Sequence, residues 1–395
     1  MNLQKEKLLE MIIKEANDIE SNLVEMRRYF HMHPETMYDE ENTASYLEKE
    51  LKNIGLSPVR VAGTGITAIL KGNTEGKTIG LRVDMDALNI TEKNDKPYIS
   101  KIPGKMHACG HDAHMACLLG AARILWKFKN FLYGNVKLIF QPAEEGGAGA
   151  YKMINEGVLH NVDEIFGLHV WSPLESGKIG VRSGPFMASS DIFEIELIGK
   201  GGHAAFPHLS IDPSAIVPDI YNAFQKIITR EIDPLENAVI SIPVFQGSNA
   251  HNIIPSKFIL KGTIRTLNPT IRNYIIKRMH EILKGYAEAW RCKAKLKFIE
   301  PSYPTVINDV ALTEKLTELL DPLGSIIKNY PPCMGGEDFA FYQERIKGVF
   351  LFLGIRNNDK GIIFPHHHPN FDIDEDVLWK GAAIYSLIGF KNSFN

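Results

Sequence analysis

The sequence has few cysteines and no long apolar run. It holds four cysteines in 395 residues, Cys109, Cys117, Cys292 and Cys333, and no two of them form a CxxC pair. A disulfide framework is therefore excluded, and a reducing compartment is expected. The apolar runs are far shorter than the ~20 residues of a membrane-spanning helix, so no membrane partner is expected. The N-terminal segment carries charges every few residues and lacks the apolar core of a secretory signal, which predicts a cytoplasmic protein.

A dominant charge is absent as well. The chain has 44 Lys and Arg against 47 Asp and Glu, which gives a formal net charge of −3. No broad positive field attracts polyanions, so nucleic acid is not expected as a partner. The length exceeds the roughly 100–200 residues of a common domain, so at least two hydrophobic cores are expected.

Apolar periodicity predicts alternating helices and strands in both terminal parts of the chain. Helices are expected at 3–30, 40–53, 112–128, 310–321 and 375–390, and strands at 65–71, 78–84, 135–140, 163–170 and 349–353. This alternation is typical of an α/β domain with a largely parallel central sheet. We place this domain at 1–186 and 301–395.

Residues 187–300 show a different pattern, which predicts a separate, inserted domain. Strands are expected at 191–199, 237–246, 257–266 and 293–299, and helices at 212–231 and 269–290. The resulting βαββαβ order is that of the ferredoxin-like arrangement.

The stretch HACGHDAH, residues 107–114, has three interpretations: a metal site, a redox cysteine, or the start of a helix. Imidazole, thiolate and carboxylate are the ligands of zinc-like ions. Cys109 and His111 sit two residues apart on a loop that enters a helix, so both side chains can reach one ion. A redox role is disfavoured because the nearest other cysteine, Cys117, falls inside the expected helix.

Further ligand-type residues follow other expected strands. Asp84 and Asp86 end one strand, Glu144 and Glu145 follow the next, His169 ends a third, and the triplet 366–368 lies near the C-terminus. The carboxyl ends of strands in an α/β sheet are where ligands bind. Adjacent side chains diverge in extended backbone, so one glutamate can bind a metal while the other handles a proton. Together these residues predict a metal centre.

These motifs resemble the M20 metallopeptidase and amidohydrolase family, in particular its aminoacylases, hippurate hydrolases and auxin-conjugate hydrolases. The similarity runs through MRRYFHMHPE, RVDMDAL, MHACGHDAHMA, IFQPAEEGG, GLHVW, GKGGHAAFPH, NIIP, GTIRT, GGEDFAFY and HHPNFDID. It implies a metal-dependent amidohydrolase that cleaves N-acyl amino acids or short peptides. It also implies that the inserted domain is a lid through which a homodimer forms.

The resemblance assigns roles to individual residues. The expected metal ligands are Cys109, His111, Glu145, His169 and His367, with His366 and His368 left as alternatives to His367. Two divalent ions are implied, zinc or manganese, with cobalt and nickel also possible. Glu144 is the expected general base, and Asp86 the aspartate that helps to hold the metal centre.

In the inserted domain the same resemblance points to substrate-binding residues. They are His203, Asn252 and Arg265, joined by Gly335 and Gly336 of GGEDF. An Arg side chain can bind a substrate carboxylate with two hydrogen bonds, but Arg265 can equally form an ion pair on the strand face. Rival functions are a carboxypeptidase or dipeptidase, a deacetylase of N-acetyl-diaminopimelate, and a metal-binding protein without catalytic activity.

Overall fold

The computed structural model describes residues 3–394, which fold into two compact units. The first comprises the chain up to Gly184 together with Ile307–Pro331 and the segment from Phe341 onwards. The second comprises Pro185–Val306 and Pro332–Ala340, a range that includes 187–300 and adds the GGEDF segment. Within the described residues, no helix has both the length and the apolar character needed to cross a bilayer.

An eight-stranded sheet runs through the first unit in the order β1-β2-β4-β3-β5-β16-β6-β15. Its strands are β1 (Val59–Val61), β2 (Gly65–Lys71), β3 (Thr74–Asp84), β4 (Tyr133–Gln141), β5 (Glu164–Glu175), β6 (Ile179–Val181), β15 (Ile326–Lys328) and β16 (Lys347–Arg356). The central strands β4, β3, β5 and β16 are parallel, while β1–β2, β2–β4 and β16–β6 pair antiparallel. The predicted α/β class with a mostly parallel sheet is confirmed.

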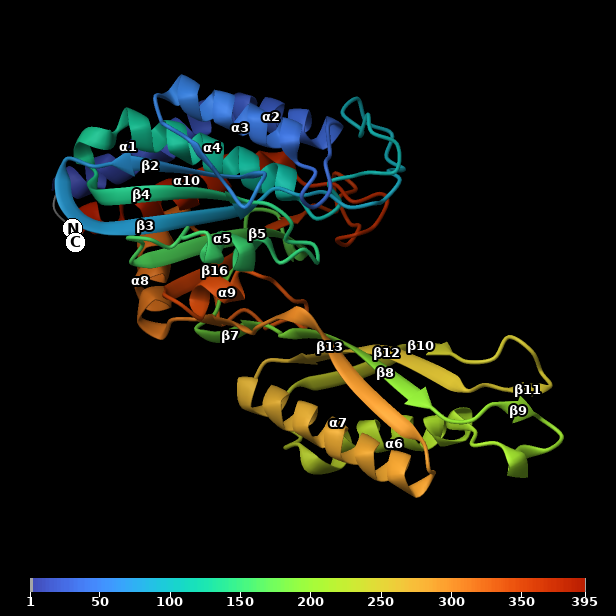
Figure 1. Ribbon diagram of the computed structural model, residues 1–395. Helices are drawn as coiled ribbons and strands as arrows, with labels where there is room; N and C mark the ends of the chain where they lie inside the picture. Colours follow the sequence, from blue (N-terminus) through green and yellow to red (C-terminus); the bar gives the residue numbers. More distant parts are fainter. Residues whose placement is uncertain (1–2, 395) are drawn as a thin grey trace. The chain divides into compact units, whose positions relative to one another are not determined.

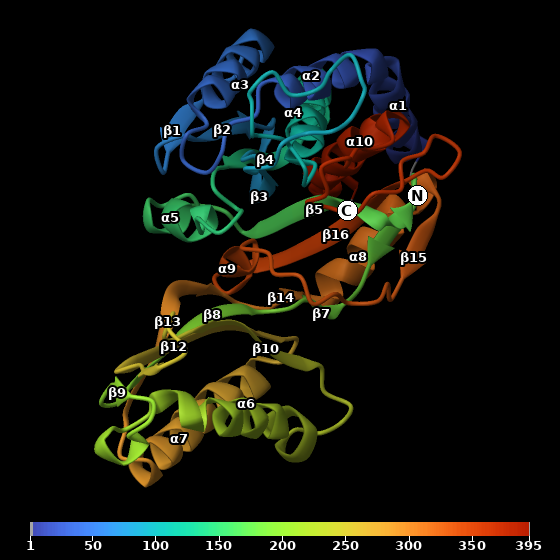
Figure 2. The ribbon, with the colours of Figure 1, turned by 90° about the vertical axis from the view of Figure 1, so that its right-hand side faces the viewer.

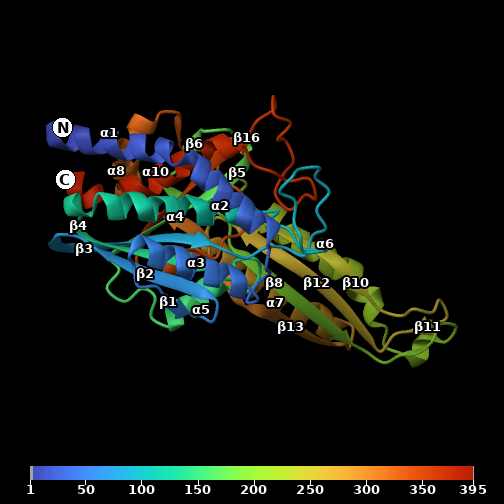
Figure 3. The same cartoon turned by 90° about the horizontal axis from the view of Figure 1, so that it is seen from above.

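Helices cover one face of this sheet, as Figures 1 and 3 show for α1, α2, α3, α4 and α10. The helices of the unit are α1 (Leu3–Asp18), α2 (Glu20–Met32), α3 (Glu41–Ile54), α4 (His111–Lys127), α5 (Gly149–Asn155), α8 (Val310–Leu320), α9 (Ala340–Gln343) and α10 (Leu378–Gly389). The central helix α4 is buried on almost every side, which explains its apolar sequence MACLLGAARIL. The single helix expected at 3–30 was wrong, because the backbone leaves helical geometry at Ile19 (ψ 6°).

The second unit has a four-stranded antiparallel sheet in the order β10-β12-β8-β13. Its elements are β8 (Ser190–Ile198), α6 (Val217–Lys226), β10 (Ala238–Gln246), β12 (Lys257–Thr266), α7 (Pro269–Ala289) and β13 (Lys293–Tyr303). Figure 2 shows α6 and α7 side by side against one face of these strands. Alternate residues of β8, Phe193, Ile195 and Leu197, are fully buried beneath them.

Shorter strands complete the description. A small two-stranded sheet pairs β9 (Gly202–His203) with β11 (Ile253–Ile254), and β7 (Gly184–Met187) pairs with β14 (Val306–Asn308). The helix expected at 212–231 is in fact a short 3-10 turn, then α6, then a π turn that ends at Glu231.

A buried guanidinium connects α2 to the first turn of α4 and to the segment that precedes α10. Arg27 on α2 is fully buried and forms ion pairs with Asp112 at 2.8 Å, Asp372 at 3.0 Å and Glu375 at 3.2 Å. Burial would raise the pKa of Asp112, but Arg27 and His31 outweigh it and hold that pKa far below its usual range. The carboxylate of Asp112 is thus charged in the folded protein and depends on Arg27.

Replacing Arg27 with Met should therefore destabilise the fold strongly. The variant leaves the buried carboxylates of Asp112 and Asp372 without their cation, and loss of one partner of such a pair typically costs about 3–5 kcal/mol. The matched variant Arg28→Met removes a guanidinium that is 41% exposed, for which about 1 kcal/mol or less is expected. Urea denaturation at pH 7 measures both free energies of unfolding, and equal effects would contradict this account.

Candidate metal centre

The predicted ligand residues come together at the carboxyl ends of the central strands. Strand β3 lies between β4 and β5 and is parallel to both, so these three strands point to one edge of the sheet. Asp86 follows β3, Glu144 and Glu145 follow β4, and His169 lies within β5. The parallel order of the sheet is what brings residues from distant parts of the sequence to one place.

The turn before α4 places Cys109 and His111. Gly110 has a φ of +89°, a backbone conformation that residues other than glycine rarely adopt. A Cβ at this position would lie 2.3 Å from Cγ2 of Val170, so glycine is also required by space. His111 is the first residue of α4, and both ligand-type side chains are buried.

Two histidines present the same ring nitrogen to the centre. Nδ1 of His111 lies 2.8 Å from the backbone oxygen of Asp86, and Nδ1 of His169 lies 2.6 Å from that of Val170. A carbonyl oxygen only accepts, so each Nδ1 carries a proton, and Nε2 is the ring nitrogen that remains to bind a metal. Nε2 of His111 is buried and has no hydrogen-bond partner among residues 3–394. Metal-binding histidines are commonly oriented in this way.

The possible ligand atoms form overlapping groups that share Cys109. The atoms of Cys109, His111 and His169 lie within 4.8 Å of one another, and so do those of Cys109, Glu145 and His367. Sγ of Cys109 is 3.5 Å from Nε2 of His169, while Glu145 and Nε2 of His367 are 3.0 Å apart. Two groups with one shared thiol are suited to two neighbouring ions.

Backbone contacts distinguish His367 from the other two histidines of the triplet. The N–H of His367 donates to the oxygen of Ala108 at 2.8 Å, and its φ of +65° turns the side chain towards Glu145. Nε2 of His366 instead accepts the N–H of Ser172 at 3.2 Å, and Nδ1 of His368 accepts that of Asn370 at 3.0 Å. The geometry therefore favours His367 over its neighbours.

Asp86 holds the loop that carries both glutamates. Its two carboxylate oxygens accept the backbone N–H groups of Glu144 and Glu145, each at 3.0 Å. The carboxylate is 1% exposed. Asp86 therefore supports the centre through the backbone of this loop and through its carbonyl contact with His111.

The acidic residues around the centre favour a positive charge there. Burial by itself would lower the pKa of His111, but the charges of Asp84 and Asp86 outweigh it and raise that pKa to about 10. Burial together with Glu145 and Glu144 raises the pKa of the Cys109 thiol well above its ordinary value. The same negative surroundings favour a divalent ion in place of these protons, and the imidazole of His111, two glutamates and a thiolate are a donor set that divalent transition metals bind.

Neighbouring polar residues form hydrogen bonds and ion pairs that hold the segments carrying the possible ligands. His114 has both ring nitrogens engaged, Nδ1 with Asp84 at 2.6 Å and Nε2 with the N–H of Val170 at 2.9 Å. Asp112 and its partner Arg27 secure the first turn of α4. Sequence reasoning missed Arg27, although Arg27 and His31 lie four residues apart on α2, where both can contact one carboxylate.

The predicted substrate-binding residues all belong to the second unit. His203 and Asn252 both line an open cavity of about 730 Å³ beside the two-stranded β9–β11 sheet. Arg265 lies on β12 and forms no ion pair with the described residues, so the structure does not support the ion-pair alternative. Gly335 accepts the N–H of Ala188 at 2.9 Å, and Gly336 packs against Ser190.

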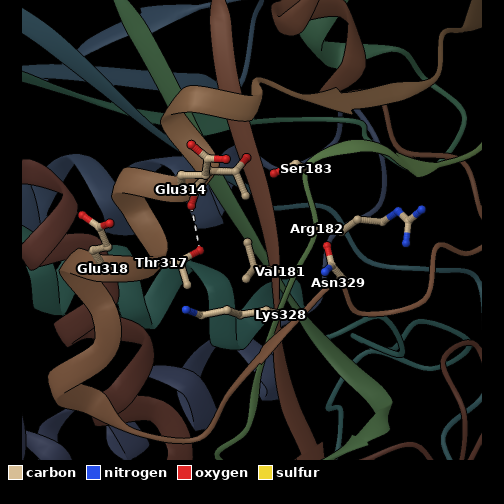
Figure 4. Close-up of a pocket in the computed structure, with 9 residues that line it drawn as sticks. Val181, Arg182, Ser183, Glu314, Thr317, Glu318, Lys328 and Asn329 are labelled. Atoms are coloured by element: carbon tan, nitrogen blue, oxygen red, sulfur yellow. Dashed lines mark hydrogen bonds between the residues drawn. The ribbon is translucent and has the colours of Figure 1, made fainter.

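Another cavity of the first unit, of about 260 Å³, is lined by none of the predicted residues. Figure 4 shows Glu314 and Thr317 of α8 facing Val181 and Lys328 across it. It has charges of both signs, and its glutamates, Glu314 and Glu318, belong to none of the possible ligand groups found among the described residues, which separates it from the centre described above.

Comparison with known proteins places these features in a family. The model of peptidase family M20/M25/M40 matches residues 80–389. The chain is 39% identical to thermostable carboxypeptidase 1 of Saccharolobus solfataricus over 98% of the chain and 99% of that protein. It is 39% identical to an IAA-amino acid hydrolase, ILR1-like 4, of Arabidopsis thaliana over 96% and 88%. Identity to N-acetylcysteine deacetylase of Bacillus subtilis is 40%, over 93% and 95%.

A solved structure agrees with these matches. The YXEP protein of Bacillus subtilis, described as a dinuclear metal-binding peptidase of the M20 family, superposes with a TM-score of 0.83. The two chains are 35% identical over 95% of this chain and 98% of that one.

Metal binding at Cys109 can be tested without any substrate. We expect the stripped protein to bind Co²⁺ and to develop a thiolate-to-metal charge-transfer absorption, because thiolate is a strong ligand for such ions. Cys109→Ser should lose this absorption. The matched variant Cys117→Ser should keep it, because Cys117 is buried in α4 next to the oxygen of Leu378. Loss of the band in both variants, or in neither, would contradict the site.

Proposed function

The chain belongs to peptidase family M20/M25/M40, and on that basis we propose that it hydrolyses the amide bond of N-acyl amino acids. The products are a carboxylic acid and a free amino acid. The observation that carries this proposal is the position of Glu144, whose carboxylate lies within 4.8 Å of ligand atoms of His111 and Glu145. A carboxylate beside a metal centre is suited to moving a proton.

Cys109, His111, Glu145, His169 and His367 are the residues proposed to hold two divalent ions, zinc or manganese, with cobalt and nickel as alternatives. The orphaned Nε2 of His111 and the shared Cys109 support this set. When bound, such ions lower the pKa of water towards about 7 and polarise a carbonyl oxygen.

Glu144 is the proposed general base. It accepts a proton from the attacking water and returns that proton to the leaving amine, so it must stay outside the ligand set. Glu145 pairs with His367, and its pKa is lowered by that contact against the opposing effect of burial, so it stays ionised. Asp86 keeps the two glutamates at fixed positions by binding their N–H groups.

Substrate recognition is assigned to the second unit. Arg265 carries a partly buried guanidinium that forms no ion pair with the described residues, since the nearby Asp191 pairs with Arg272, and it can bind the α-carboxylate of an N-acyl amino acid. His203 and Asn252 share one cavity, which supports a joint role at the substrate. Gly335 and Gly336 remain proposed backbone contacts.

We also propose that the protein is a homodimer joined through the second unit. The edge strands of its sheet, β10 and β13, have exposed apolar residues such as Val239 and Ile299. Exposed sheet edges are suited to pairing with another chain.

A carboxypeptidase or deacetylase specificity is the competing proposal, since relatives of each name are about equally similar to this chain. All three activities use the same hydrolytic chemistry and differ in the acyl group. The sequence distance to these relatives therefore does not decide between them.

Glu144→Gln should abolish most turnover and keep the bound metal. The amide has nearly the same shape as the carboxylate but does not take up a proton, and loss of general base catalysis typically lowers kcat about 10²–10⁴-fold. Metal content is measured by atomic emission and turnover by release of free amino acid. Glu314→Gln, an exposed position on α8, is the control and should behave like the parent protein. Unchanged kcat in Glu144→Gln would remove it from this role.

A substrate panel tests the proposed specificity together with Arg265. Acetyl, benzoyl and peptidyl amino acids are compared, each with a free or an amidated α-carboxylate. We expect the acyl compounds to be preferred, and amidation to raise KM. Arg265→Met should raise KM by about 10–100-fold for the free acids, which corresponds to the ~1.5–3 kcal/mol of a charged hydrogen bond, and should remove the discrimination against the amides. Preference for peptidyl substrates would instead support the carboxypeptidase alternative.

A further inference from the structure

The loop after β4 is held by two buried carboxylates. Three consecutive backbone N–H groups, those of Ala143, Glu144 and Glu145, donate to carboxylate oxygens. Asp86 accepts the last two, and Glu40 accepts that of Ala143 at 3.0 Å. Asp86 was expected near the metal centre, whereas Glu40, at the start of α3, was not.

The side chain of Glu40 is held in place by burial and by hydrogen bonds. Its side chain is fully buried, and its other carboxylate oxygen accepts the hydroxyl of Thr64 at 2.6 Å. Thr64 is itself only 2% exposed. The backbone oxygen of Glu40 accepts the N–H of Ala44 in the first turn of α3. The carboxylate therefore has a defined position before it contacts the loop.

Ala143 is the residue of the loop that most needs such a contact. Its φ is +54°, a left-handed conformation that is unfavourable for a residue with a Cβ. The residue is fully buried, so its N–H has no access to water and depends on Glu40. Without this bond, the backbone at 143 is free to relax towards an extended conformation and to rotate Glu144.

We propose that Glu40 is a positioning residue, which holds the left-handed backbone of Ala143 so that the Glu144 carboxylate stays at the metal centre. This inference rests on the proposed function, because it concerns the residue assigned as general base. It adds a carboxylate that contacts neither the ligand residues nor the substrate. A misplacement of about 1 Å is enough to lower a catalytic rate about 100-fold.

The conservative variant is Glu40→Gln. A glutamine oxygen can accept the N–H of Ala143, and its amide group can donate to the hydroxyl of Thr64, which is also an acceptor. Burial, against the opposing hydrogen bond from Thr64, raises the pKa of Glu40 to about 7, so a neutral side chain is close to what the pocket already accommodates. The disruptive variant is Glu40→Met, which has a similar volume and no acceptor.

We expect Glu40→Met to lower kcat about 30–100-fold, with KM within about twofold and two ions still bound, as fits a misplaced base rather than a lost site. Glu40→Gln should recover kcat to within about threefold of the parent protein. The matched control is Glu164→Met, which removes another buried carboxylate, one paired with Lys77 and Lys391 at the start of β5, and should leave kcat unchanged.

A second variant covers the case in which Glu40→Met does not fold. Thr64→Val removes the hydroxyl that orients Glu40 and leaves the Ala143 contact possible, so a smaller loss in kcat, of about 3–10-fold, is expected. Parent-like kcat in a folded Glu40→Met protein, or in Thr64→Val if the former is insoluble, would overturn the proposal. Failure of the proposed function itself looks different, because Glu144→Gln would then retain full turnover or the parent protein would cleave no substrate of the panel.

Discussion

Buried acceptor atoms that converge on one space are the constraint on which the rest of this structure depends. The thiol of Cys109, the Nε2 atoms of His111 and His169, and the carboxylate of Glu145 lie together where water is largely excluded. A protein interior does not tolerate such a concentration of lone pairs and negative charge without a compensating cation. The same negative surroundings raise the pKa of His111, which shows that they favour a positive charge at this place. The donor set is therefore suited to a cation site, and a solved relative in the same family is described as a dinuclear metal-binding peptidase.

A second layer of charged groups makes this convergence possible. The guanidinium of Arg27 pairs with Asp112, which follows His111, and with Asp372, which lies five residues after His367. One buried cation thus ties together two segments that carry proposed ligands and that are distant in the sequence. Asp86 connects the turn after β3 to the loop after β4 in a similar way, through hydrogen bonds to its carboxylate. Burying these ion pairs costs desolvation free energy, but the buried pairs hold the geometry of the centre fixed.

The sequence predicted those features that depend on local pattern or on residue chemistry. Strands β2 and β12 were placed to the residue, because turn residues bound each apolar segment. The ligand residues were recognisable because Cys, His and Glu seldom cluster after strands for structural reasons alone. His367 was chosen from the motif, with its two neighbours as alternatives, and that choice stays a prediction. The features that set His367 apart, its backbone φ and its contact with Ala108, belong to the folded chain and have no local sequence signal. Glu40 was missed because its partner Ala143 lies 103 residues away.

The loop after β4 explains how two adjacent glutamates can have different tasks. In extended backbone their side chains would diverge, but here a left-handed residue precedes them and their own N–H groups are held by one carboxylate. Because Asp86 binds both N–H groups, a change to it disturbs the proposed ligand and the proposed base together. Glu40 acts one residue earlier, at Ala143, so its influence reaches Glu144 first and Glu145 through it. The proposed tasks of metal binding and proton transfer are thus separable in this loop, although the two residues to which they are assigned are neighbours.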